Sequence, residues 1–174
     1  MRKFCVIILF IVNTLTLLTS CEEWEGRIVI FNDDRNKADA RMEQLLKVIT
    51  NKDEDKLKGM FSKQAINDAL DFDDGMESLF DLIQGDIVSW KRERFSSSGL
   101  REEGKKYTKT LTWYTVVTDE NDYLIFASDY IVNTVDPDNL GFYTLRAKKK
   151  VDQETSFDVY WNELEKPGII KTEE

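Results

Sequence analysis

The apolar positions of this chain repeat with a helical period after residue 37 and alternate after residue 86. In the first segment they fall at i, i+4, i+7, i+8 and i+11, which is one face of a helix: Ala38, Met42, Leu45, Leu46 and Ile49. Asn51 and Glu54 have the spacing of a capping box. They predict a second helix, which carries Leu57, Met60 and Phe61.

Two further helical segments follow the same logic. Ser62 is placed to cap a short turn that holds Ala65, Ile66 and Ala69. Asp71–Gly75 reads as an acidic break, after which Asp74 and Glu77 repeat the capping pattern. The next apolar face contains Met76, Leu79, Phe80 and Ile83, and Gly85 is placed to end that helix.

The second half of the chain predicts strands. Residues 87–95 alternate loosely, and Ser96–Gly99 reads as a loop. Stretches rich in Thr, Val, Ile and aromatic residues cover 107–118, 123–135 and 142–148, with turns at 119–122 and 136–139. Helices followed by a meander predict an α+β domain over residues 38–170, with a tail at 171–174. The N-terminal helices would pack on a curved antiparallel sheet of about four strands.

The strand at 123–135 is apolar on both faces. One face carries Leu124, Phe126, Tyr130 and Val132, and the other carries Ile125, Ala127, Ile131 and Val135. A sheet with one face in water alternates cleanly, so something must cover the second face. The cover is either the tail around Phe157, Tyr160 and Trp161, or a second copy of the chain in a homodimer that pairs through the patch of Ile125, Ala127 and Ile131.

The amino terminus has the layout of an export signal. Arg2 and Lys3 precede an apolar run, Phe4–Leu18. Spanning a bilayer takes about 20 apolar residues, and this run is shorter and followed by acids. It therefore predicts a secretory signal peptide, with a retained membrane anchor as the alternative.

The end of this run resembles the lipobox of bacterial lipoproteins: Leu18-Thr19-Ser20-Cys21. The resemblance implies a signal peptide at residues 1–20, cleavage between Ser20 and Cys21, and a diacylglyceryl thioether on Cys21. An ordinary cleavage site beside a chance cysteine is the alternative. Cys5 would leave with the signal peptide, so the exported domain would have no cysteine. The chain would then sit on the extracytoplasmic face of the cell membrane, joined to it by the covalent lipid.

Residues 21–37 would be the lipid-anchored tether. They are charged and carry one apolar patch, Ile28–Phe31, which adds an edge strand in the alternative interpretation.

The composition excludes several classes of catalytic and binding site. The 174 residues include no His, which removes His bases, His metal ligands and His-containing triads. The net charge of −9 becomes −11 once the first twenty residues, with two bases and no acid, are removed. An acidic body repels phosphate backbones, so nucleic acid is not an expected partner. The basic pair at 91–92 and the three lysines at 148–150 are interpreted as solvated strand ends.

Candidate sites are few. Acidic stretches starting at Asp71 and Asp136 lack the spacing of a calcium loop, so we predict no metal and no cofactor. Asp129 with Tyr114 or Tyr130 has the residue types of an isomerase acid–base pair, and a hydrogen-bonded structural acid is the plainer interpretation. An aromatic pocket is a further possibility; its residues would be Trp90, Trp113, Tyr114, Asp129 and Tyr130, although such clusters in sheets usually form core.

Several strings resemble a family of small bacterial lipoproteins, common in Firmicutes, whose domain has no assigned function. They are Ala38–Met42, Leu79–Asp86 with Trp90, Trp113-Tyr114, and Asn139–Tyr143. The order of helices and strands is also similar to the cystatin-like, nuclear-transport-factor-2-like cone. The resemblance covers residues 38–170 and implies no catalytic residue.

The sequence thus predicts a membrane-anchored binding or interaction domain with an unknown protein or small-molecule partner. Capture of a small molecule in a cone pocket is the first alternative, and an isomerase-like enzyme using Asp129 is the second.

Overall fold

The computed structural model describes residues 22–152, 157 and 161–171. The chain divides into two units, Met1–Asp33 and Asp34–Glu174, and everything below concerns the second unit except the helix that begins in the first. The predicted signal peptide, Ser20 and Cys21 lie outside the described residues. Among the described helices, none has the length and hydropathy to cross a bilayer.

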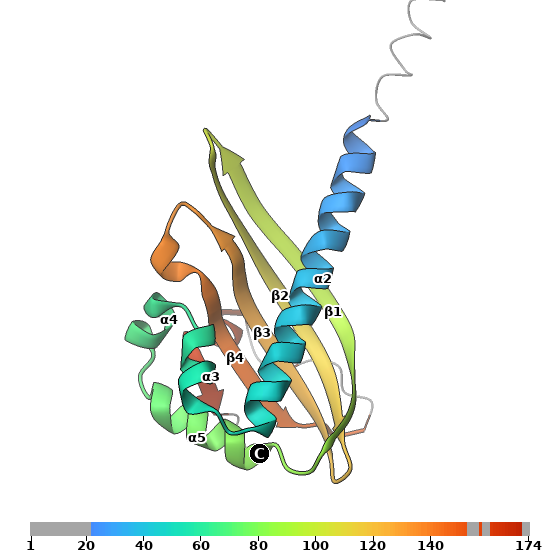
Figure 1. The fold of residues 1–174 in the computed structure, drawn as a ribbon, viewed down its shortest axis with the longest axis vertical. Helices are drawn as coiled ribbons and strands as arrows, with labels where there is room; N and C mark the ends of the chain where they lie inside the picture. The colour runs from blue at the N-terminus through green and yellow to red at the C-terminus, as the bar shows by residue number, and fades with distance from the viewer. Residues whose placement is uncertain (1–21, 153–156, 158–160, 172–174) are drawn as a thin grey trace, which may run out of the picture. The chain divides into compact units, whose positions relative to one another are not determined.

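Helices come first and strands second, which confirms the predicted α+β class. The helices are α2 (Glu22–Thr50), α3 (Glu54–Met60), α4 (Lys63–Asp68), α5 (Phe72–Leu82) and α6 (Trp161–Leu164), with a 3₁₀ turn, η1, at Pro137–Asn139. The strands are β1 (Ile87–Glu102), β2 (Lys105–Thr118), β3 (Asp122–Asn133), β4 (Gly141–Lys149) and β5 (Gly168–Lys171). They form one sheet in the order β1-β2-β3-β4-β5 (Figure 1).

The main core lies between the sheet and the helices α2 to α5. The predicted apolar face of α2 is buried in full, from Ala38 to Ile49, and α5 contributes Met76, Leu79, Phe80 and Ile83. On the sheet, Tyr123, Ile125 and Ala127 of β3 meet these helices. Burying one such aliphatic side chain contributes about 1.5–3 kcal/mol, so this interface is the main source of stability.

The opposite face of β3 is covered by the carboxyl-terminal part of the same chain. Trp113, Leu124 and Phe126 form a second cluster with Phe157 and Leu164. The predicted cover by the tail is therefore present, and its described residues are Phe157 and Leu164. The side chains of Tyr160 and Trp161, which were also predicted to contribute, lie outside the described residues. Ile125 and Ala127, predicted as a patch for a second copy, are buried beneath the helices. Whether the chain dimerises stays a prediction.

The helix boundaries differ from the predicted ones. The first helix begins at Glu22 rather than Ala38, so the predicted tether is helical and the alternative edge strand at Ile28–Phe31 does not form. Asp34 is buried, and its Oδ2 accepts a hydrogen bond of 2.8 Å from Ser97 of β1.

Two predicted caps were wrong and one is confirmed. Asp53, not Asn51, caps α3, and its side chain accepts from the Lys56 amide. Asp74 lies inside the first turn of α5, which begins at Phe72. Ser62 caps α4 as predicted, accepting from the Ala65 amide at 3.0 Å. Acidic residues are equally suited to a cap and to a first turn, so spacing alone did not separate the two positions.

The sheet differs from prediction at its two edges. Ser96–Gly99 is not a loop, because β1 runs through it and pairs with β2 up to a turn at Glu103-Gly104. The fifth strand, β5, pairs in parallel with β4 and was not predicted. It is four residues long and follows Pro167, so it carries too little pattern to be found by alternation.

Candidate functional site

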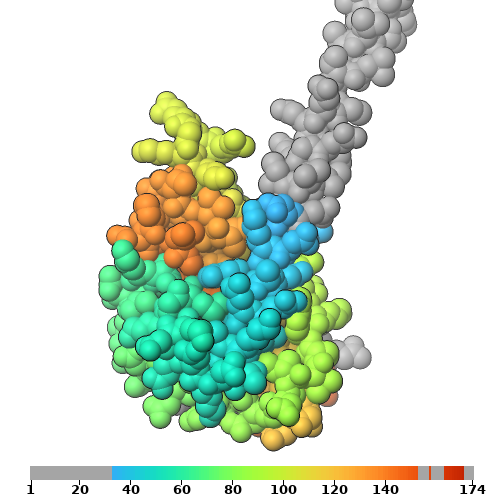
Figure 2. Space-filling view, in the orientation of Figure 1, coloured from blue at the N-terminus to red at the C-terminus, as the bar shows by residue number. Residues whose placement is uncertain are grey.

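An open groove of about 430 Å³ lies where α2, α3 and the facing ends of β3 and β4 meet. Figure 2 shows the blue residues of α2 beside the orange part of the chain, and residues of both line this groove. Its lining combines two cations with apolar and backbone surface: Lys37, Ala40, Arg41, Gln44, Gly59, Met60, Tyr130, Ile131, Leu140 and Gly141.

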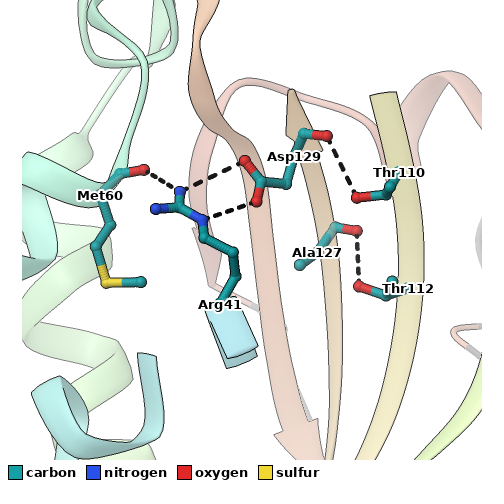
Figure 3. A network of polar contacts seen from close by, with 6 residues as sticks. All are labelled: Arg41, Met60, Thr110, Thr112, Ala127 and Asp129. Carbon is teal, nitrogen blue, oxygen red and sulfur yellow. Dashed lines mark hydrogen bonds and ion pairs between the residues drawn. The ribbon is translucent and has the colours of Figure 1, made fainter. Parts of the chain in front are cut away.

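Arg41 is the polar centre of this groove. Its Nε donates to Oδ2 of Asp129 at 3.0 Å, and its Nη2 donates to the Met60 carbonyl at 3.0 Å and lies 3.5 Å from Oδ1 of Asp129 (Figure 3). The guanidinium carbon sits 4.6 Å from the centroid of the Phe142 ring. One side chain of α2 thus binds β3, the end of α3 and β4 at once.

Asp129 reaches Arg41 because of the way β3 is paired. Two register shifts flank it: Ile131 is the extra residue on β3 opposite β2, and Tyr143 is the extra residue on β4. Such bulges bend a strand and redirect its side chains. The backbone carbonyl of Asp129 also accepts a hydrogen bond from Thr110 Oγ1 at 3.4 Å, which joins this part of β3 to β2 (Figure 3).

The two partners differ in their access to water. Asp129 is 3% exposed, whereas 29% of the Arg41 side chain is exposed. Burial raises the pKa of Asp129, and the charge and hydrogen bonds of Arg41 oppose that shift. The carboxylate therefore depends on Arg41 for compensation, while the guanidinium keeps a face toward solvent.

The five residues predicted to form an aromatic pocket do not share one. The rings of Trp90 and Tyr114 meet edge to face with their centroids 5.6 Å apart, and Tyr114 is fully buried. Trp113, the neighbour of Tyr114, lies on the opposite face of the sheet against Phe126. Successive side chains of a strand point to opposite faces, so Trp113 and Tyr114 belong to different layers. Tyr130 lines the groove described above, and Asp129 lies behind Arg41.

The predicted pairing of Asp129 with Tyr114 does not form. Tyr114 pairs across the ladder with Ile125, which lies four residues before Asp129 on β3. Its hydroxyl donates to Asp39 at 3.1 Å, and Asp39 also forms an ion pair with Arg92. Burial and the nearby Asp39 raise the pKa of the Tyr114 phenol, so it serves as a neutral donor that joins α2 to β2.

Arg41 was missed at the sequence level, although a signal was present. It lies three residues after Ala38 and four before Leu45, so it borders the buried stripe of its helix. An arginine at such a border can reach an acceptor on the elements packed against its helix, and Asp129 is an acid in the middle of a largely apolar strand. The missing element was the contact between positions 88 apart in sequence.

Residues 44–150, more than half of the chain, match the family described as a domain of unknown function, DUF5104. The chain belongs to the DUF5104 family. The matched region of this DUF5104 protein runs from the last two turns of α2 to the end of β4, and it includes Gly59, Met60 and Asp129. Arg41, α6 and β5 lie outside the matched residues. No curated protein matches the chain.

Within the described residues, no group of three or more acidic, Cys or His side chains is placed to hold a metal ion.

Proposed function

We propose that this protein is a bacterial lipoprotein, anchored at the extracytoplasmic face of the cell membrane, whose folded domain is a binding module. The anchor is supported by Arg2 and Lys3, the apolar run that follows, and the lipobox-like end at Cys21. The binding role is supported above all by the groove at Arg41, which exposes a cation held in place from behind by a buried acid.

The fold proposal is a cystatin-like cone. It is supported by the order of helices and strands and by the sheet, which packs helices on one face.

Lipid attachment is tested with a labelled fatty acid. We expect the label to enter the full-length chain and its Cys5→Ala variant, and to be absent from Cys21→Ala, because only the Cys21 thiol follows the cleavage motif. The matched Cys5 variant separates loss of the thiol at one position from a general effect of cysteine removal. Label persisting in Cys21→Ala would disprove the anchor.

The binding role is tested by native mass spectrometry of the whole chain released from its host membranes in mild detergent. We expect an added mass on the wild type and on Gly59→Ala, and none on Gly59→Leu. Gly59 lines the groove and an added Cβ there has no heavy atom within 4 Å, so a leucine adds bulk at the groove without disturbing the core. A spectrum without any added mass, or the same added mass on Gly59→Leu, would count against the groove.

Capture of a small molecule is favoured over a protein interface by the size of the groove, which falls within the range of about 300–1,000 Å³ usual for small-ligand sites. The isomerase alternative gains nothing from the site. Both carboxylate oxygens of Asp129 face Arg41, and Tyr114, one of the two tyrosines predicted as its partner beside Tyr130, is bonded to Asp39.

A further inference from the structure

The groove at Arg41 differs in charge from the other hollows of the domain. Its lining contains Lys37 and Arg41 and no acidic residue. The hollow between α5 and β5 is lined by three aspartates and one lysine: Asp68, Asp71, Asp74 and Lys166. The hollow beside Trp90 includes one acid and one base, Glu43 and Lys47. In a chain of net charge −9, a lining with cations and no acid marks a place where an anion is tolerated.

The hydrogen bonds of Arg41 leave one end of the guanidinium for a ligand. Nε and Nη2 bond to Asp129 and Met60, whereas Nη1 makes no hydrogen bond to the residues that the structure describes. Nη1 carries two N–H donors, and a charged N–H bonds strongly to a carboxylate or phosphate oxygen. Since Asp129 is 3% exposed and lies behind Arg41, a ligand in the groove meets the guanidinium and not the carboxylate.

The rest of the lining suits the body of such a ligand. Ile131 and the half-exposed Leu140 give the groove apolar surface, whereas the Met60 side chain is buried in the core. The Met60 carbonyl stands at the end of α3, where a helix carries partial negative charge, and Arg41 already bonds to it. The hydrogen bond from Arg41 therefore offsets the partial negative charge of this carbonyl.

We propose that the groove binds a small ligand through a carboxylate or phosphate group held by the Nη1 end of Arg41, with the ligand's apolar part against Ile131 and Leu140. This inference rests on the binding function proposed above and adds the chemical class of the ligand. Asp129 acts as a positioning residue that keeps the guanidinium in one orientation.

The test uses the Nε–Hε signal of Arg41 in the whole chain, ¹⁵N-labelled in non-ionic detergent and assigned with Arg41→Lys. Inorganic phosphate and succinate are titrated separately at ionic strength held constant with chloride. In a third arm the micelles are doped with phosphatidylglycerol, with phosphatidylcholine as the control. We expect a saturable shift with at least one of these anions. A response to phosphate or succinate indicates a free anion, and a response to phosphatidylglycerol alone indicates a lipid headgroup.

Two variants of equal size measure the charge preference. Gly59 is an exposed helical position with open space around it, so Gly59→Gln and Gly59→Glu place the same volume in the groove. We expect the glutamate variant to bind the anion at least about fivefold more weakly than the glutamine variant, because it adds one negative charge near Arg41.

Equal affinities of the two Gly59 variants, or an Arg41 signal that responds to none of the anions, would overturn this inference. In that case an added mass that is present on the wild type and absent from Gly59→Leu would leave the binding function standing with a different ligand class. Loss of that added mass from the wild type as well would remove both proposals.

Discussion

Arg41→Met is expected to lower the free energy of unfolding by about 3 kcal/mol, because it leaves the carboxylate of Asp129 buried without a partner. Methionine keeps the length of the side chain and much of its contact with Phe142, so the loss reports mainly on charge. Urea unfolding followed by circular dichroism on the full chain measures the change.

Removing the charge of the other partner, Asp129, should lower the free energy of unfolding by less. Asp129→Asn leaves Arg41 unpaired, but 29% of the arginine side chain is exposed, so water replaces part of the lost interaction. We expect a loss of about half that of Arg41→Met, or about 1–2 kcal/mol. The double variant Arg41→Met/Asp129→Leu removes both charges, and we expect it to be more stable than Arg41→Met alone. Equal losses in the two single variants would contradict the assignment of Asp129 as the dependent partner.

The stability of Arg41→Met should also depend on pH. Arg41 lowers the pKa of Asp129 against the effect of burial, so its removal raises that pKa further above the ordinary value of 3.8. A carboxyl group with a raised folded-state pKa binds more protons in the folded state than in the unfolded state. The difference in free energy of unfolding between wild type and Arg41→Met should therefore become smaller as the pH falls from 7 toward 4. A deficit that stays constant over this range would show that Asp129 is not the group affected.

Gly75→Ala is expected to destabilise the domain by about 1–3 kcal/mol, although alanine favours a helix. Gly75 lies within α5, and a Cβ there would stand 2.3 Å from the carbonyl oxygen of Ile169 in β5 and 3.1 Å from its Cβ. The obstacle is backbone of the edge strand, so either α5 or β5 must move. Thermal or urea unfolding of the full chain measures the loss.

Gly59→Ala is the matched control, because Gly59 also lies within a helix and its added Cβ has no neighbour within 4 Å. It should raise stability by up to about 1 kcal/mol, the usual advantage of alanine over glycine in a helix. The same glycine-to-alanine change is thus expected to lower the free energy of unfolding at position 75 and to raise it at position 59. If Gly75→Ala were also stabilising, the close contact of α5 with β5 would be wrong.

Local pattern was enough to predict much of this fold. The stripe from Ala38 to Ile49, the cap at Ser62 and the α+β order each depend on residues within a few positions of one another, and each is confirmed. A helix face or a cap is decided by near neighbours, so the sequence carries its signal directly.

Other features were decided only by tertiary contacts. Both faces of β3 are apolar, and which face meets the helices depends on how the whole sheet is oriented, so Ile125 and Ala127 were assigned to the wrong surroundings. The strand β5 is held by β4 and by the close approach of Gly75, neither of which appears in its four residues.

The candidate site is the clearest case. The sequence pointed to Asp129 as an unusual acid, but its partner is an arginine 88 positions earlier, brought near by helix packing and by two bulges in the sheet. A buried charge reveals that a partner must exist and does not reveal which one, because ion pairing depends on distance in space and not along the chain. The sequence alone therefore determined the class of the fold and the proposed address at Cys21, and the three-dimensional packing decided where a ligand has room and which cation it would meet.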